Sequence, residues 1–194
     1  PEAQADQIVR RHDGPTATSL AGYRNRHALY RTDPDLQALH ASAPCLVIWD
    51  DHEVENAYAD RWSQHVAVSP EKFLRRRARA YRAYYEHMPL RASTLSRDGA
   101  LRLHRLVRYG KLATFTMLDC RQYRSEQPCG TPTSRRGRIA GAACGQRADP
   151  NRSMLGAAQE QWLFESFKRA DTAWNIIGQT QLIAQLQHRD FSGE

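Results

Sequence analysis

The chain carries one compact group of acidic and imidazole side chains, the run Asp50-Asp51-His52-Glu53, directly after the apolar segment 45–49. Open α/β sheets place ligands at the carboxyl ends of their strands, so this run is a candidate functional site. Adjacent carboxylates with a histidine can bind hard or borderline cations and can transfer protons. A solvated loop that caps the next segment has the same composition. The run alone leaves both interpretations open.

A second polar group, with Asp119, Arg121 and Arg124, follows the apolar segment 112–118. A guanidinium offers planar N–H donors that match a phosphate, which makes Arg121 and Arg124 candidate substrate-binding residues. An Asp and an Arg at the end of a strand also form structural salt bridges. The pattern by itself favours the structural interpretation.

Other familiar motifs are absent from the sequence. It contains no P-loop, no G-x-G-x-x-G, no G-x-S-x-G and no H-E-x-x-H. The four cysteines include no C-x-x-C pair, which argues against a zinc ribbon or a thioredoxin site. Cys129 and Cys144 lie in a polar loop where a free thiol has little packing use. A disulfide between them is the natural pairing if the protein is exported.

Three regions have helical periodicity. Residues 19–42 divide into two helices at Asp33-Pro34, because Asp is a good N-cap and Pro suits the first helical position. A helix over 70–88 follows a serine cap and a proline. A further helix is expected over 156–170, with four large side chains facing inward: Trp162, Leu163, Phe164 and Phe167.

Short apolar segments between these helices predict strands. Residues 45–49 and a segment within 172–180 have the composition of buried strands, and residues 101–108 alternate as a strand does. A turn leads from there into a strand over 112–118. The Pro-, Gly- and Arg-rich residues 125–153 form a long loop of the kind that often acts as a lid. Helices that alternate with strands predict an α/β class without a linker between domains.

The composition of the chain is basic, with more Lys and Arg than Asp and Glu. The 194 residues carry a net charge of +7 at an ordinary charged fraction of 25%, which favours anionic partners such as phosphorylated substrates, anionic lipid or nucleic acid. Five arginines gather within residues 75–82. They form either a solvated helix face or a surface that steers phosphate. No apolar run reaches the roughly eighteen residues of a membrane span.

The order of several motifs resembles that of the PhoD-like alkaline phosphatases. The similar stretches are residues 23–31, 49–54, 81–91, 117–124 and 174–179. The likeness spans nearly the whole chain in a consistent order, which is more specific than any single motif. It implies part of a calcineurin-like metallophosphoesterase core, a sandwich of mixed β-sheets flanked by helices.

The resemblance also implies roles for residues of the candidate site. Asp51 takes the place of a metal ligand, and His52 takes that of the histidine that contacts phosphate or protonates the leaving oxygen. Asp50, Glu53 and Asn56 are neighbouring candidates, with Asp50 and Asn56 as further metal ligands. Calcium and iron are the metals that the resemblance implies. Arg121 is the expected substrate-binding residue.

The implied activity is metal-dependent hydrolysis of phosphate monoesters and diesters, including phospholipids, by a periplasmic or extracellular enzyme. The alternatives are a phospholipase D-type phosphodiesterase of the same family and a non-catalytic, basic nucleic-acid-binding domain. A sequence that begins at Pro1 does not begin at a translational start, and residues 1–194 are expected to be the central part of one catalytic domain.

Two departures and two missing segments accompany the resemblance. Ala57 stands where the family commonly has a second asparagine, and Cys120 stands where threonine is usual. An early metal-binding segment would precede Pro1, and a late one that contains histidine would follow Glu194. We therefore expect these residues alone to be inactive, or nearly so.

Overall fold

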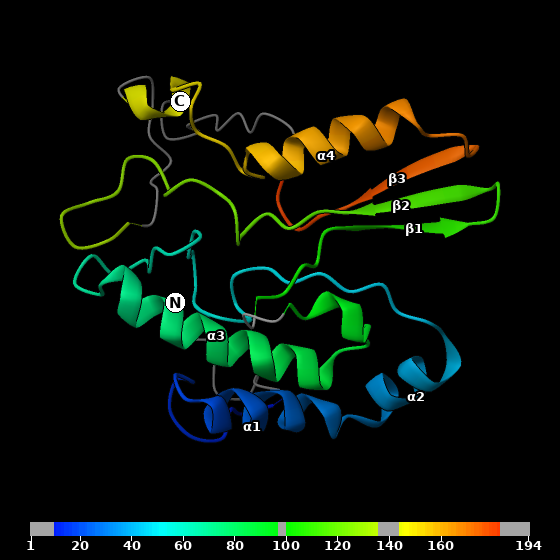
Figure 1. The fold of residues 1–194 in the computed structure, drawn as a ribbon. Coiled ribbons are helices and arrows are strands. Elements are labelled where there is room, and N and C mark those ends of the chain that lie inside the picture. Colours follow the sequence, from blue (N-terminus) through cyan, green and yellow to red (C-terminus); the bar gives the residue numbers. More distant parts are fainter. Residues whose placement is uncertain (1–9, 97–99, 136–143, 183–194) are drawn as a thin grey trace, which may run out of the picture.

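Helices and one small sheet form an α/β fold (Figure 1). This computed structural model describes residues 10–96, 100–135 and 144–182. The regular elements are α1 (Leu20–Arg31), α2 (Pro34–Ser42), α3 (Pro70–His87), α4 (Ala157–Lys168), β1 (Arg105–Tyr109), β2 (Ala113–Met117) and β3 (Trp174–Gly178), with short 3-10 turns at Ala92–Thr94 and Gly145–Ala148. The predicted α/β class is confirmed. Within the described residues the helices accompany one mixed sheet.

The first three helices begin where their capping residues predict. The side chain of Ser19 accepts a hydrogen bond from the N–H of the third residue of α1, and Asp33 and Ser69 accept in the same way at α2 and α3. Proline occupies the first position of both α2 and α3. Each cap satisfies an N–H that has no partner within the helix.

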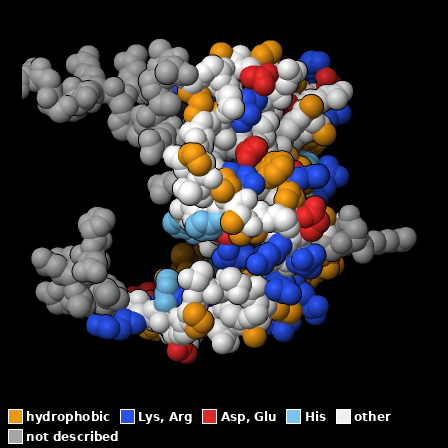
Figure 2. Space-filling view, turned by 90° about the vertical axis from the view of Figure 1, so that its left-hand side faces the viewer, with side chains coloured by type: hydrophobic (Ala, Val, Ile, Leu, Met, Phe, Trp, Pro, Cys, Tyr) orange, Lys and Arg blue, Asp and Glu red, His pale blue; other side chains and the backbone are white. Residues whose placement is uncertain are grey.

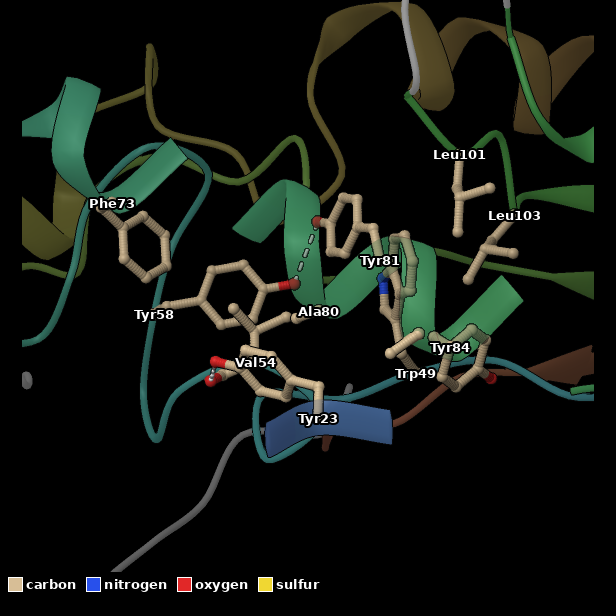
Figure 3. Packing of buried hydrophobic residues seen from close by; sticks show 11 residues of the cluster. Tyr23, Trp49, Val54, Tyr58, Phe73, Ala80, Tyr81, Tyr84, Leu101 and Leu103 are labelled. Carbon is tan, nitrogen blue, oxygen red and sulfur yellow. Dashed lines mark hydrogen bonds between the residues drawn. The ribbon is translucent and has the colours of Figure 1, made fainter. Parts of the chain in front are cut away.

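The main core lies between α3, α1 and the segment that follows α2 (Figure 3). Trp49 is fully buried and stacks on Tyr81, with ring centroids 3.9 Å apart. Tyr58 and Tyr81 share a hydrogen bond of 3.1 Å between their hydroxyls. The Tyr23 hydroxyl of α1 donates to the carbonyl of Val54 at 2.6 Å. This core thus holds the chain on both sides of residues 50–53.

The sheet has the order β1-β2-β3, with β1 antiparallel and β3 parallel to β2. Gly110 turns the β1–β2 hairpin with a φ of +54°, a conformation in which glycine pays no steric penalty. The predicted strand over 101–108 begins late, because Leu101 and Leu103 are buried in the core beside α3. Figure 1 shows α4 beside the sheet, with α3 and α1 on the opposite side of the molecule.

Two predictions of burial were wrong. The strand within 172–180 forms as β3 but is not buried, since Trp174 is 66% exposed. In α4 Leu163 faces inward as expected, whereas Phe164 and Phe167 are exposed. The reason is the same in both cases: among the described residues, no element lies over these side chains, although their composition is that of a covered surface.

The prediction of a strand at residues 45–49 was also wrong. These residues are neither strand nor helix, and within the described part of the chain no neighbouring strand pairs with them. A strand exists only through hydrogen bonds to a neighbour. Here the carbonyl of Val47 accepts instead from the Arg105 guanidinium, at 2.9 Å. The segment still leads directly into Asp50, so the predicted position of the polar run does not change.

The described parts of the loop 125–153 are irregular apart from the turn at Gly145–Ala148. Cys129 and Cys144 are joined as a disulfide with their Cα atoms 6.0 Å apart, a distance within the usual range. Arg135 attaches the loop to the segment after Trp62, donating to the carbonyl of His65 at 2.9 Å and lying over the Trp62 ring. Among the helices described, none is long and apolar enough to cross a membrane.

Candidate active site

The polar run lies on a tight turn after Trp49. The N–H groups of Val54 and Glu55 donate to the carbonyl of Asp51 at 2.9 and 2.8 Å. A carboxylate oxygen of Asp51 accepts from the N–H of Ala57, which has a left-handed φ of +57°. Asparagine adopts that conformation more readily than alanine, which gives a physical reason for asparagine at this position in the family pattern. These bonds fix the buried Asp51 carboxylate.

Three side-chain atoms of this turn converge near the surface. His52 is 79% exposed, and its Nε2 lies 3.1 Å from Asn56 Oδ1 and 3.9 Å from Asp51 Oδ1. The nitrogen of an exposed imidazole thus lies within 4 Å of one amide oxygen and one carboxylate oxygen. These are donor atoms of the type that calcium and iron accept in proteins. The exposed imidazole is also free to approach a substrate.

Asp50 pairs with Arg121, whose guanidinium also lies 3.6 Å from Asp51 Oδ1. The Arg121 Nε donates to Asp50 Oδ1 at 2.6 Å, and the same oxygen accepts from Thr180 at 3.2 Å and from Gln181 at 2.9 Å. The Arg121 side chain is only 6% exposed. Glu53 accepts from the backbone N–H of Asp50 and so braces the turn.

The second polar group reaches the first because Asp119 folds the chain sharply after β2. The fully buried Asp119 accepts from the N–H groups of Arg121 and Gln122 at 3.0 and 2.9 Å. Gln159 of α4 closes the opposite side with bonds to both backbone groups of Asp119, each of 2.9 Å. The two groups that follow separate apolar segments in the sequence therefore meet in one place.

Comparison with known proteins identifies the family of this arrangement. Residues 2–194 match the PhoD-like phosphatases. The chain belongs to the PhoD-like phosphatase family. It is 44% identical, over 177 residues, to alkaline phosphatase D of Bacillus subtilis (strain 168). That match covers 91% of this chain and 29% of the relative.

A solved structure of PhoD also matches, with a TM-score of 0.78 and 44% identity over 91% of this chain and 32% of that chain. The described PhoD-like chain therefore has the PhoD fold over this region. It spans less than a third of the length of either relative.

The predicted metal ligands of this PhoD-like chain are brought together only in part. Within the described ranges, no three His, Cys, Asp or Glu side chains lie close enough to hold a metal ion. Asp50 forms an ion pair with Arg121, whereas Asp51 and Asn56 each have a side-chain oxygen within 4 Å of His52 Nε2. Their donor chemistry fits a divalent or trivalent cation. It supplies fewer than the four or more donors that a full shell needs.

Arg124 is the second guanidinium of the group after β2. Its Nε is buried without a hydrogen-bond partner. Burial, together with the neighbouring Arg121, lowers the pKa of Arg124. Burial also raises the pKa of the Cys120 thiol, which favours its neutral form. The cysteine that replaces the usual threonine therefore acts here as a small buried side chain.

The arginines of α3 have mostly internal partners, although several Lys and Arg side chains gather on the face where α3 begins (Figure 2). Arg76 pairs with the buried Glu55, Arg77 with Asp60 at 3.1 Å, and Arg82 with Glu86 of the next turn. These contacts favour the structural interpretation of the cluster.

Sequence analysis did not single out Gln64, Thr180 or Gln181, whose side chains contact the two halves of the site. No spacing or composition signal marks them. Only their position in the fold does.

Proposed function

We propose that this chain is the central part of a phosphoesterase domain that hydrolyses phosphate esters with the help of bound metal. The observation that carries the proposal is the convergence of Asp51, His52 and Asn56 on an exposed turn in a PhoD-like fold. Alkaline phosphatase D, the matched relative, is named for the same class of reaction.

In this proposal Asp51 and Asn56 bind a cation through their side-chain oxygens. A cation held there would polarise a phosphoryl oxygen and offset the charge that develops on it. Asp51 suits this role because the N–H of Ala57 and the turn fix its carboxylate before any ligand binds. His52 contacts the substrate and gives a proton to the leaving oxygen, for which its exposure leaves room.

Arg121 supports the site from the interior. Its Nε is bonded to Asp50, while its Nη2 lies 3.6 Å from Asp51 and its Nη1 lies 3.5 Å from the carbonyl of Tyr58. All three nitrogens thus face protein groups. The prediction that Arg121 binds substrate stays a prediction, and these contacts support a role in holding the two carboxylates.

The finer assignments rest on the family. Calcium and iron are the metals we propose, with phosphate monoesters, phosphate diesters or phospholipids as substrates. A periplasmic or extracellular location agrees with the Cys129–Cys144 disulfide, since such bonds persist in oxidising compartments. A phospholipase D-type preference would use the same residues. Residues 1–194 are proposed to need further segments of the domain for activity.

The test uses the full-length protein that contains these residues. Hydrolysis of a chromogenic phosphate monoester at alkaline pH should disappear with chelator. Asp51→Ala should weaken metal binding, whereas His52→Ala should mainly lower kcat. Robust hydrolysis by residues 1–194 alone would show that the site is misplaced. Full activity of the His52→Ala protein would remove His52 from the mechanism.

A further inference from the structure

Four side chains beside the candidate site form one hydrogen-bonded row. His52 Nε2 contacts Asn56 Oδ1 at 3.1 Å, and Asn56 Nδ2 donates to Gln64 Oε1 at 3.2 Å. Gln64 Nε2 in turn contacts His65 Nε2 at 3.1 Å. Because an amide nitrogen only donates and an amide oxygen only accepts, the row has a direction. Each amide fixes which end of its neighbour faces it.

The backbone of Gln64 is fixed from two sides. Its N–H donates to the buried Glu55 carboxylate at 2.9 Å, and its carbonyl accepts from the N–H of Arg135 at 2.6 Å. Glu55 is itself bonded to Ser63 and paired with Arg76 of α3. Gln64 is therefore held between the core and the loop that carries the disulfide.

We propose that Gln64 is a positioning residue that sets the orientation of the Asn56 side-chain amide. The proposal rests on the function proposed above, in which the oxygen of Asn56 binds a cation. Because Gln64 Oε1 accepts from the NH₂ group of Asn56, the oxygen of Asn56 faces His52, whose Nε2 also lies 3.9 Å from Asp51 Oδ1.

An asparagine amide has two ends of almost equal size and opposite polarity. Without an acceptor at Gln64, rotation by half a turn would present the NH₂ group of Asn56 to the cation, and that group repels positive charge. Replacing a side chain that orients a metal ligand typically lowers metal affinity about 10–100-fold. The row thus predicts an effect on binding from a residue that need not touch the metal.

The test is calorimetric titration of Ca²⁺ into the full-length protein after chelator treatment. Gln64→Leu, which removes the acceptor, should raise the Kd about 10-fold or more. Gln64→Glu keeps an oxygen toward Asn56 and should bind Ca²⁺ no more weakly than wild type. Gln64→Asn has a side chain one methylene shorter, so its oxygen should not reach Asn56 and Ca²⁺ binding should weaken too. This variant replaces Gln64→Leu in the test if the leucine variant does not fold. Gln37→Leu is the matched control, since the Gln37 side chain of α2 donates one hydrogen bond to the backbone carbonyl of Arg31 at the end of α1.

A double-mutant cycle separates orientation from general support. Asn56→Asp supplies an oxygen at both ends of the side chain, so adding Gln64→Leu to it should cost little affinity. An equal loss from Gln64→Leu in both backgrounds would overturn the proposal, as would unchanged affinity in the single variant. Absence of Ca²⁺ binding and of hydrolysis in the wild-type protein would instead overturn the proposed function, and this inference with it.

Discussion

Replacing Arg121 by methionine distinguishes its two proposed roles, because methionine keeps much of the side-chain volume and removes the charge. Arg121 is almost fully buried, with one short charge-assisted hydrogen bond to Asp50 and a longer approach to Asp51. Removing one partner of a fully buried pair costs about 3–5 kcal/mol. Asp50 is 36% exposed and keeps contacts with Thr180 and Gln181, which reduces the cost. We expect a loss of about 2–3 kcal/mol of unfolding free energy.

The assay compares urea unfolding, Ca²⁺ affinity and the separate values of kcat and KM in the full-length protein. Arg121→Met should lower stability and weaken Ca²⁺ binding, because Asp51 would lose a fixed neighbour. Arg108→Met is the control: its ion pair with Asp171 is exposed, so the cost should stay below about 1 kcal/mol. A raised KM with unchanged stability and unchanged Ca²⁺ affinity would refute the supporting role and favour direct substrate binding.

Two further predictions concern stability and redox state. Burial, with the neighbouring His87 and Arg31, lowers the pKa of His27 to about 4. Between about pH 6.5 and 4 the unfolded chain therefore binds a proton at His27 that the folded chain does not. As the pH falls through that window, the free energy of unfolding should decrease by about 1–2 kcal/mol, a value reduced for the partial exposure of the side chain. His27→Gln should abolish this part of the pH dependence in urea unfolding. Thiol labelling without reductant should modify neither Cys129 nor Cys144, and labelling of both in secreted material would contradict the disulfide.

Helix positions were predictable from the sequence because their signals are local. Asp33-Pro34 and Ser69-Pro70 each combine a side-chain acceptor with a residue that has no N–H to satisfy, and both helices begin there. The hairpin between β1 and β2 follows from alternating residues around Gly110. Such signals act within a few residues and do not depend on the rest of the fold.

Strand pairing and burial were less predictable because they depend on neighbours that are distant in sequence. The composition of residues 45–49 is typical of a strand, yet they have no strand partner in the described part of the chain. Trp174 and Phe164 are apolar but exposed, because no element among the described residues covers them. An apolar side chain shows only that its surface is suited to burial, and a sequence pattern does not show whether another element covers it. The predicted position of the polar run was still correct, because Asp50 directly follows Trp49 in the chain whether or not residues 45–49 form a strand.

The site residues differ in exposure, from the buried Arg121 to the exposed His52, and the spacing of these residues in the sequence does not predict that difference. Asp50 and Arg121 are 71 residues apart, and their pairing requires both the turn after Trp49 and the fold that Asp119 imposes after β2. In that arrangement the Arg121 guanidinium is buried beside Asp50 and Asp51, whereas the His52 imidazole is exposed. A charge buried in a pair stabilises a fixed arrangement, whereas an exposed imidazole can exchange protons with a ligand. We therefore propose that His52 and its neighbours carry the chemistry of the site and that Arg121 supports them from the interior.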